Sequence, residues 1–99
     1  MTARTPAQAT VQVDEPTLRV TRFDFPPGSE TGWHRHGAAY VVVPLQGGTL
    51  TVEDAQGSRG YPIETGRSYA RPAGVEHNIA NDTDAAISFV EIEMLDRQG

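Results

Sequence analysis

The chain of 99 residues has the length of one domain, carries a formal net charge of -5 and contains no cysteine. The missing cysteine excludes thiolate metal ligands, a cysteine nucleophile and disulfide bonds, and it fits a reducing compartment. The acidic charge opposes contact with nucleic acid, and no apolar run approaches the length of a membrane span. We therefore expect a cytoplasmic protein with no nucleic-acid or membrane partner, stabilised by a bound metal ion or by self-association.

Residues 1–10 are small and polar, which predicts a flexible N-terminal arm before a single domain over residues 11–99. From residue 11 onward, short runs rich in Val, Ile, Thr, Tyr and Phe alternate with turn residues, and no segment has a helical period. The pattern predicts an all-β sandwich or barrel. The predicted strands are Thr17–Phe25, Trp33–Pro44, Thr49–Glu53, Ser68–Arg71, His77–Ala80 and Ile87–Leu95.

The three histidines of the chain are the candidate metal ligands. His34 and His36 are two residues apart in a predicted strand, so their side chains point to the same face, with Cα atoms about 7 Å apart. Two imidazoles at that separation can bind one ion at about 2.1 Å. His77 begins another predicted strand after a Pro-x-Gly turn. A barrel that places this strand opposite the first would complete a three-nitrogen site.

Two glycine-framed motifs surround these histidines, and in them the chain resembles the cupin superfamily. The first family motif is glycine, five residues, His-x-His, three or four residues, glutamate, six residues and glycine. The second is glycine, five residues, Pro-x-Gly, two residues, histidine, three residues and asparagine. Nine of the ten fixed positions match, and Tyr40 replaces the glutamate. The matching residues are Gly28, His34, His36, Gly47, Gly66, Pro72, Gly74, His77 and Asn81.

The resemblance implies a double-stranded β-helix, the cupin or jelly-roll barrel, with His34, His36 and His77 as metal ligands. The glycines and Pro-x-Gly then form strand-to-strand turns, and Asn81 caps the turn after its strand. Trp33 has the opposite parity from the histidines and is expected to face outward. An outward aromatic side chain in so short a chain favours a homodimer.

Tyr40 is the one departure from the family pattern. It shares the parity of the histidines and is expected to face inward. Three interpretations are open: a hydrogen-bond donor to a bound ligand, a packing residue of the core, or a phenolate ligand of the metal. Glu91 and Glu93 alternate with apolar residues on the last strand. One of them could replace the missing acid, but we expect both to face outward.

A site of three neutral imidazoles leaves open positions on a divalent ion, and it is similar to the iron sites of cupin dioxygenases. The resemblance implies a metal-dependent, dioxygenase-like enzyme acting on a small anionic metabolite. Iron is the expected native metal, although Zn, Ni, Mn and Cu also accept imidazole ligands. Arg71 precedes the Pro-x-Gly turn, where it could bind a substrate carboxylate or lie on the solvated surface.

Two other functions stay open: a non-catalytic cupin that captures a small molecule through its metal, and a Lewis-acid isomerase or lyase. Further stretches of the chain look like small cupins associated with bacterial β-alanine degradation. This resemblance implies a pathway and no particular reaction. It is carried by residues 32–36, 41–45, 74–78 and 89–93.

Overall fold

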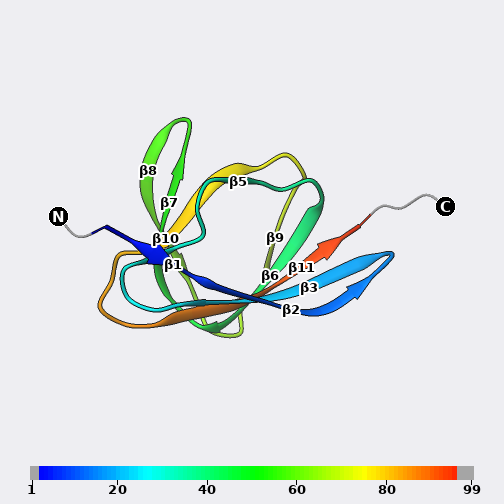
Figure 1. Ribbon diagram of the computed structural model, residues 1–99, viewed down its shortest axis with the longest axis horizontal. Coiled ribbons are helices and arrows are strands. Elements are labelled where there is room, and N and C mark those ends of the chain that lie inside the picture. The colour runs from blue at the N-terminus through cyan, green and yellow to red at the C-terminus, as the bar shows by residue number, and fades with distance from the viewer. Residues whose placement is uncertain (1–2, 96–99) are drawn as a thin grey trace.

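The computed structural model describes residues 3–95, in which the chain forms strands and no helix (Figure 1). The predicted all-β class is therefore confirmed. No helix in this range is long and apolar enough to cross a membrane. The strands are β1 (Thr5–Pro6), β2 (Gln8–Glu15), β3 (Leu18–Phe25), β4 (Ser29–Glu30), β5 (His34–Arg35), β6 (Ala39–Gln46), β7 (Gly48–Asp54), β8 (Gly57–Ile63), β9 (Tyr69–Arg71), β10 (Glu76–Asn81) and β11 (Ile87–Met94).

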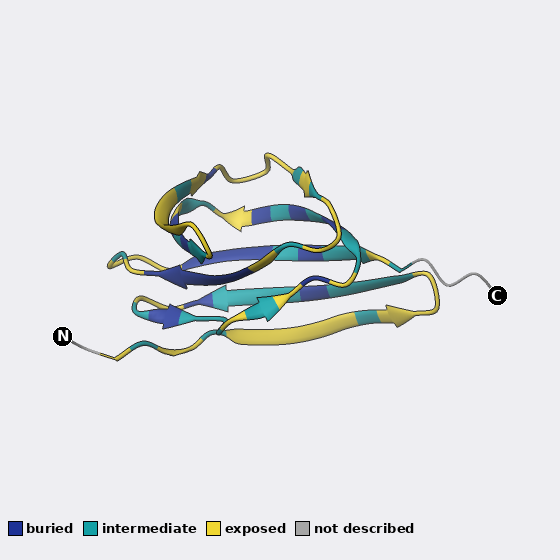
Figure 2. Ribbon diagram, turned by 90° about the horizontal axis from the view of Figure 1, so that it is seen from above, coloured by how far each residue is buried: buried dark blue, intermediate teal, exposed yellow. Residues whose placement is uncertain are grey.

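The strands form two sheets that lie one above the other as layers (Figure 2). The first sheet has the order β1-β4-β10-β7-β8, with β5 also paired to β10, and the second has the order β2-β3-β11-β6-β9. Successive strands such as β6 and β7 belong to different sheets, so the chain crosses from one layer to the other. This is the double-stranded β-helix that the sequence predicts.

The hydrophobic core fills the space between the layers, because alternate side chains of each strand point to the same face. It draws on both sheets, and three phenylalanine rings of the second sheet pack together with centroids 5.4 to 6.3 Å apart. Burying each large apolar side chain contributes about 1.5–3 kcal/mol to stability. The buried members of the core cluster are Phe25, Tyr40, Val42, Leu50, Val52, Ile63, Ile79, Ile87 and Phe89.

The N-terminal segment is more ordered than its composition predicts. Thr5–Pro6 pairs in parallel with β4, and β2 begins at Gln8, so the expected boundary between arm and domain falls inside a strand. Thr5 N–H donates to the carbonyl of Gly28 at 2.9 Å. Polar edge strands of this kind lack the apolar alternation that identifies a strand from sequence, because little of their surface is buried.

The predicted strand Trp33–Pro44 is two strands in the structure. β5 pairs with β10 in the first sheet, whereas β6 pairs with β11 and β9 in the second, and the chain crosses between the sheets at residues 36–38. β8 lies outside the predicted set, because its Gly and Pro residues disfavour a central strand. It pairs only with β7, an edge position where a proline is tolerated.

Two motif residues hold turns as the resemblance implies. Gly47 leaves no room for a side chain, since a Cβ atom there would lie 2.5 Å from the carbonyl oxygen of Ile63. Asn81 is fully buried, and its side chain donates to the carbonyls of Phe25 at 2.9 Å and Ala85 at 2.7 Å. It also accepts from Thr83, so Asn81 fixes the turn after β10.

Candidate metal centre

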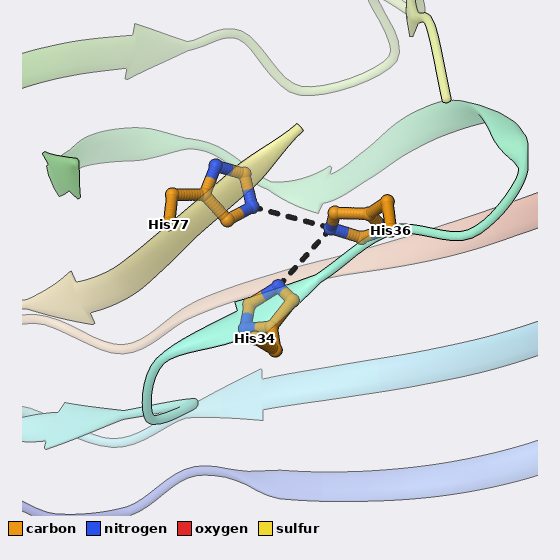
Figure 3. A group of neighbouring side chains, drawn as sticks. All are labelled: His34, His36 and His77. Carbon is orange, nitrogen blue, oxygen red and sulfur yellow. Dashed lines mark hydrogen bonds between the residues drawn. The ribbon is translucent and has the colours of Figure 1, made fainter. Parts of the chain in front are cut away.

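The three histidines meet at the inner surface of the first sheet (Figure 3). His34 lies on β5 directly opposite His77 on β10, in a register fixed by the antiparallel pairing of the two strands. His36 follows β5 and is fixed by its backbone, which donates to the carbonyl of Val75 and accepts from Gly74, both at 2.8 Å. The strand opposition that the sequence requires for a three-nitrogen site is therefore present.

The Nε2 atoms of the three rings converge on one point. His36 Nε2 lies 3.1 Å from His34 Nε2 and 3.2 Å from His77 Nε2. Two ligand nitrogens about 2.1 Å from one ion are about 3.0 Å apart at a right angle and about 3.4 Å apart at the tetrahedral angle. The spacing of the nitrogens thus fits ligation of a single transition-metal ion.

Burial keeps two of these ligands neutral. Desolvation, with a smaller effect from neighbouring His34, lowers the pKa of His36 from 6.5 to about 4. Desolvation and the other two histidines lower the pKa of His77 to about 4 as well. Imidazole binds a metal only in its neutral form, so both side chains remain competent ligands well below neutral pH.

Tyr40 is buried and faces inward as predicted, with its ring stacked on that of His36 at a centroid distance of 3.9 Å and an interplanar angle of 19°. Burial, reinforced by the charge of Glu91, raises the pKa of Tyr40 to about 12. The phenol is therefore protonated at neutral pH in the metal-free site, which disfavours the phenolate interpretation. The stacking contact makes Tyr40 a support for the His36 ring.

The prediction that Glu91 faces outward is wrong. Glu91 is buried at 7% exposure, and its Oε1 lies 3.4 Å from His36 Nδ1. Glu91 shares the parity of Phe89, a core residue two positions earlier on β11, and this shared parity is the signal that could have placed it. Glu93 is half-buried and lies 3.6 Å from the guanidinium of Arg19. Glu91 approaches His36 at Nδ1, away from the point where the Nε2 atoms meet, and a carboxylate oxygen of Glu93 lies within 4.8 Å of both residues.

A cavity of about 340 Å³ opens beside the three histidines. Apolar side chains limit water on its inner walls, among them Val42, Val75 and Ile79. Its polar lining includes Tyr40, Glu91 and two arginines. The size lies within the range of small-molecule sites in proteins.

The two arginines of the cavity differ in their partners. Arg59 forms an ion pair with Asp54 at 2.7 Å. Arg71 packs against the rings of Tyr61 and Tyr69, with its guanidinium carbon 5.2 and 5.1 Å from their centroids, and its Nη2 donates to the Tyr61 hydroxyl. In residues 3–95 no carboxylate forms an ion pair with Arg71. Arg71 thus carries an uncompensated positive charge into the cavity.

Trp33 and Arg35, which flank His34, are exposed, as their parity predicts. Trp33 is 55% exposed. These side chains lie outside the metal centre.

The fold agrees with comparisons to known proteins. The chain is 50% identical to the beta-alanine degradation protein BauB of Pseudomonas aeruginosa over 94 residues, which cover 95% of this chain and 99% of the relative. The crystal structure of a cupin domain from Bordetella pertussis Tohama I superposes with a TM-score of 0.92 at 49% identity, covering 95% of this chain and 98% of that one.

More distant structures share the fold alone. A cupin-like protein from Thermotoga maritima superposes with a TM-score of 0.74 at 18% identity, over 94% of this chain and 71% of that one.

A family model described as "Cupin domain" matches residues 21–93, which contain all three histidines. The chain therefore belongs to the cupin family.

Proposed function

We propose that this cupin is a metal-dependent, dioxygenase-like enzyme that oxidises a small anionic metabolite, with iron as its native metal. The observation that carries the proposal is the ligand set of His34, His36 and His77, whose Nε2 atoms converge at the wall of a cavity with no carboxylate among them. Three neutral ligands leave the full charge of a divalent ion, which favours an anionic substrate. Bound iron would supply the chemistry by which the substrate reacts with molecular oxygen, and imidazole ligands suit that metal.

The protein itself supplies binding and orientation. Arg71 supports recognition of an anion, because its guanidinium lines the cavity without a carboxylate partner and is positioned by two tyrosine rings. A guanidinium binds a carboxylate through two parallel hydrogen bonds, which fixes the orientation of the bound molecule. The 50% identity to a beta-alanine degradation protein supports a role in the metabolism of small carboxylic acids.

Metal analysis of protein purified without added metal and without an affinity tag tests the metal. We expect about one iron per chain, and we expect His36→Ala and His77→Ala to abolish stoichiometric metal. Arg22→Gln is a matched control, because Arg22 pairs with Asp24 on β3, outside the site. Unchanged metal content in both histidine variants would exclude the assigned ligands.

Oxygen uptake by the iron-loaded protein with a panel of small carboxylic acids tests the activity. Arg71→Gln should raise the KM of an active acid, whereas Arg59→Gln should change it less, since Asp54 already neutralises Arg59. Equal effects of the two substitutions would contradict a special role for Arg71.

A Lewis-acid isomerase or lyase is the second candidate, favoured by one observation. Glu91 lines the cavity, so the protein offers an inward carboxylate that could move a proton. Such an enzyme would be equally active without oxygen. Turnover under anaerobic conditions that is lost in Glu91→Gln would support it over the dioxygenase, and binding of an acid without turnover would support a non-catalytic cupin.

A further inference from the structure

A continuous chain of polar contacts joins the N-terminal segment to one of the histidines. It begins at Arg4, whose guanidinium lies 2.9 Å from carboxylate oxygens of Glu53 and Asp82 and 3.2 Å from Glu30. These acids come from β7, from the turn after β10, and from β4. Their ion pairs with Arg4 raise the pKa of Arg4, so the arginine remains charged.

The next member is the buried side chain of Asn78 on β10. Its Nδ2 donates both hydrogens, one to Glu30 and one to Glu53, each at 2.8 Å. These two bonds fix the orientation of the amide, because the reverse orientation would place its oxygen against two carboxylates. Arg4 allows the two carboxylates to share one amide, since its positive charge offsets their mutual repulsion.

The oriented amide then reaches His34 through Gly32. Asn78 Oδ1 accepts from the backbone N–H of Gly32 at 2.9 Å, and the carbonyl of Gly32 accepts from His34 Nδ1 at 2.8 Å. The backbone of Gly32 has a φ of +89°, which side chains other than glycine rarely adopt. A carbonyl can only accept, so the bond to Gly32 places a proton on Nδ1 of His34, and in a neutral imidazole this leaves Nε2 with its lone pair. His34 Nε2 is the atom that lies 3.1 Å from His36 Nε2, at the point where the three rings converge.

His34 needs this support more than the other two histidines. It lies on a strand of only two residues and is half-buried, whereas His36 and His77 are buried. Its ring is fixed by the loop before it, because the bond to Gly32 and a 3.2 Å contact with Thr31 Oγ1 are its polar contacts on the Nδ1 side.

We propose that Asn78 is a positioning residue of the metal centre, and that Arg4 of the N-terminal segment maintains it through Glu30 and Glu53. The chain of contacts holds His34 in the tautomer that a metal ligand requires. Partners that orient a metal-binding imidazole typically change metal affinity by about 10–100-fold when they are removed. This inference rests on the metal site alone and requires no catalytic activity.

Titration of the metal-free protein with Co²⁺, in competition with a chelator, measures the effect on affinity. We expect Asn78→Ala to weaken Co²⁺ binding by about 10–100-fold, and Arg4→Gln to weaken it by about tenfold. Arg4→Lys retains the charge and should recover part of the loss. Arg22→Gln removes a surface arginine that pairs with Asp24 and should leave the affinity unchanged.

Nitrogen NMR of the imidazole rings in the metal-free protein separates positioning from general stability. The wild type should show His34 protonated at Nδ1, and Arg4→Gln and Asn78→Asp should shift His34 toward a mixture of tautomers. Asn78→Asp keeps the acceptor for Gly32 and replaces the donors, so it also serves if Asn78→Ala does not fold.

Wild-type affinity for Co²⁺ together with wild-type His34 shifts in Arg4→Gln and Asn78→Asp would overturn the inference, whatever their melting temperatures. Weak Co²⁺ binding by the wild type would argue against the proposed function. In that case the ring shifts still decide whether the chain of contacts positions His34.

Discussion

Acidifying the metal-free protein from pH 7 to pH 5 should lower its free energy of unfolding, because two buried histidines take up protons when the chain unfolds. Folding lowers the pKa of His36 and His77 from 6.5 to about 4, so between these values the unfolded chain binds more protons than the native one. Stability is therefore lost as the pH falls below 6.5.

Glu91 acts in the opposite direction. Burial, with a smaller effect from the charge of Glu93, raises the pKa of Glu91 from 4.5 to about 7. The native state therefore binds this proton first, and Glu91 adds stability as the pH falls from 7 toward 4.5.

The magnitudes follow from about 1.36 kcal/mol per pKa unit. Between pH 7 and pH 5, each histidine removes roughly 2 kcal/mol and Glu91 returns roughly 2 kcal/mol. The net loss in the wild type is about 1–2 kcal/mol, and in Glu91→Gln it should grow to about 4 kcal/mol. The second value is a large share of the roughly 5–15 kcal/mol that stabilises a typical domain.

Urea denaturation in the presence of a chelator, at pH 7, 6 and 5, measures both free energies directly. This window lies above the range in which the ion-paired carboxylates titrate, because their partners lower the pKa of Glu53, Asp54 and Asp82. If Glu91→Gln were no more sensitive to acid than the wild type, the opposed contributions of the histidines and Glu91 would be refuted.

Three further predictions concern packing, ligand binding and assembly. Gly47→Ala should destabilise the fold by several kcal/mol, as its Cβ would meet backbone atoms, whereas Gly37→Ala, with open space around it, should change the urea midpoint little. Tyr40→Phe should preserve metal content. If calorimetry shows ligand binding weakened by about 1–3 kcal/mol, the hydroxyl donates a hydrogen bond to the ligand, and if binding is unchanged, Tyr40 is a packing residue of the core. Light scattering should show a dimer at micromolar concentration that Trp33→Glu weakens, and a monomeric wild type would contradict this.

The sequence alone determined which residues form the candidate metal centre. His34, His36 and His77 are recognisable because their glycine and proline neighbours have the spacing of cupin turns, and turns of this kind need particular residues. The inward position of Tyr40 followed from strand parity, since side chains alternate between two faces.

Tertiary structure decided which of the two faces is the inside. On β11, Glu91 and Glu93 alternate with Val90 and Ile92, and from sequence the charged pair would be placed in solvent. The structure turns the face of Glu91 inward, because β11 lies between β3 and β6 and the core is built on its Phe89 side. Parity groups Glu91 with Phe89 on one face and Val90 with Ile92 on the other, and the partner strands and the opposite sheet decide which of these two faces is buried.

Contacts between residues far apart in the chain could not be predicted from the sequence either. The crossing between sheets at residues 36–38 depends on the pairing of β5 with β10, residues about forty positions apart. The order of the N-terminal segment depends in the same way on Arg4, whose partners Glu30, Glu53 and Asp82 are distant in the chain. Local composition predicts a polar and mobile segment. It does so because the acidic residues that hold the segment come together only in the folded barrel.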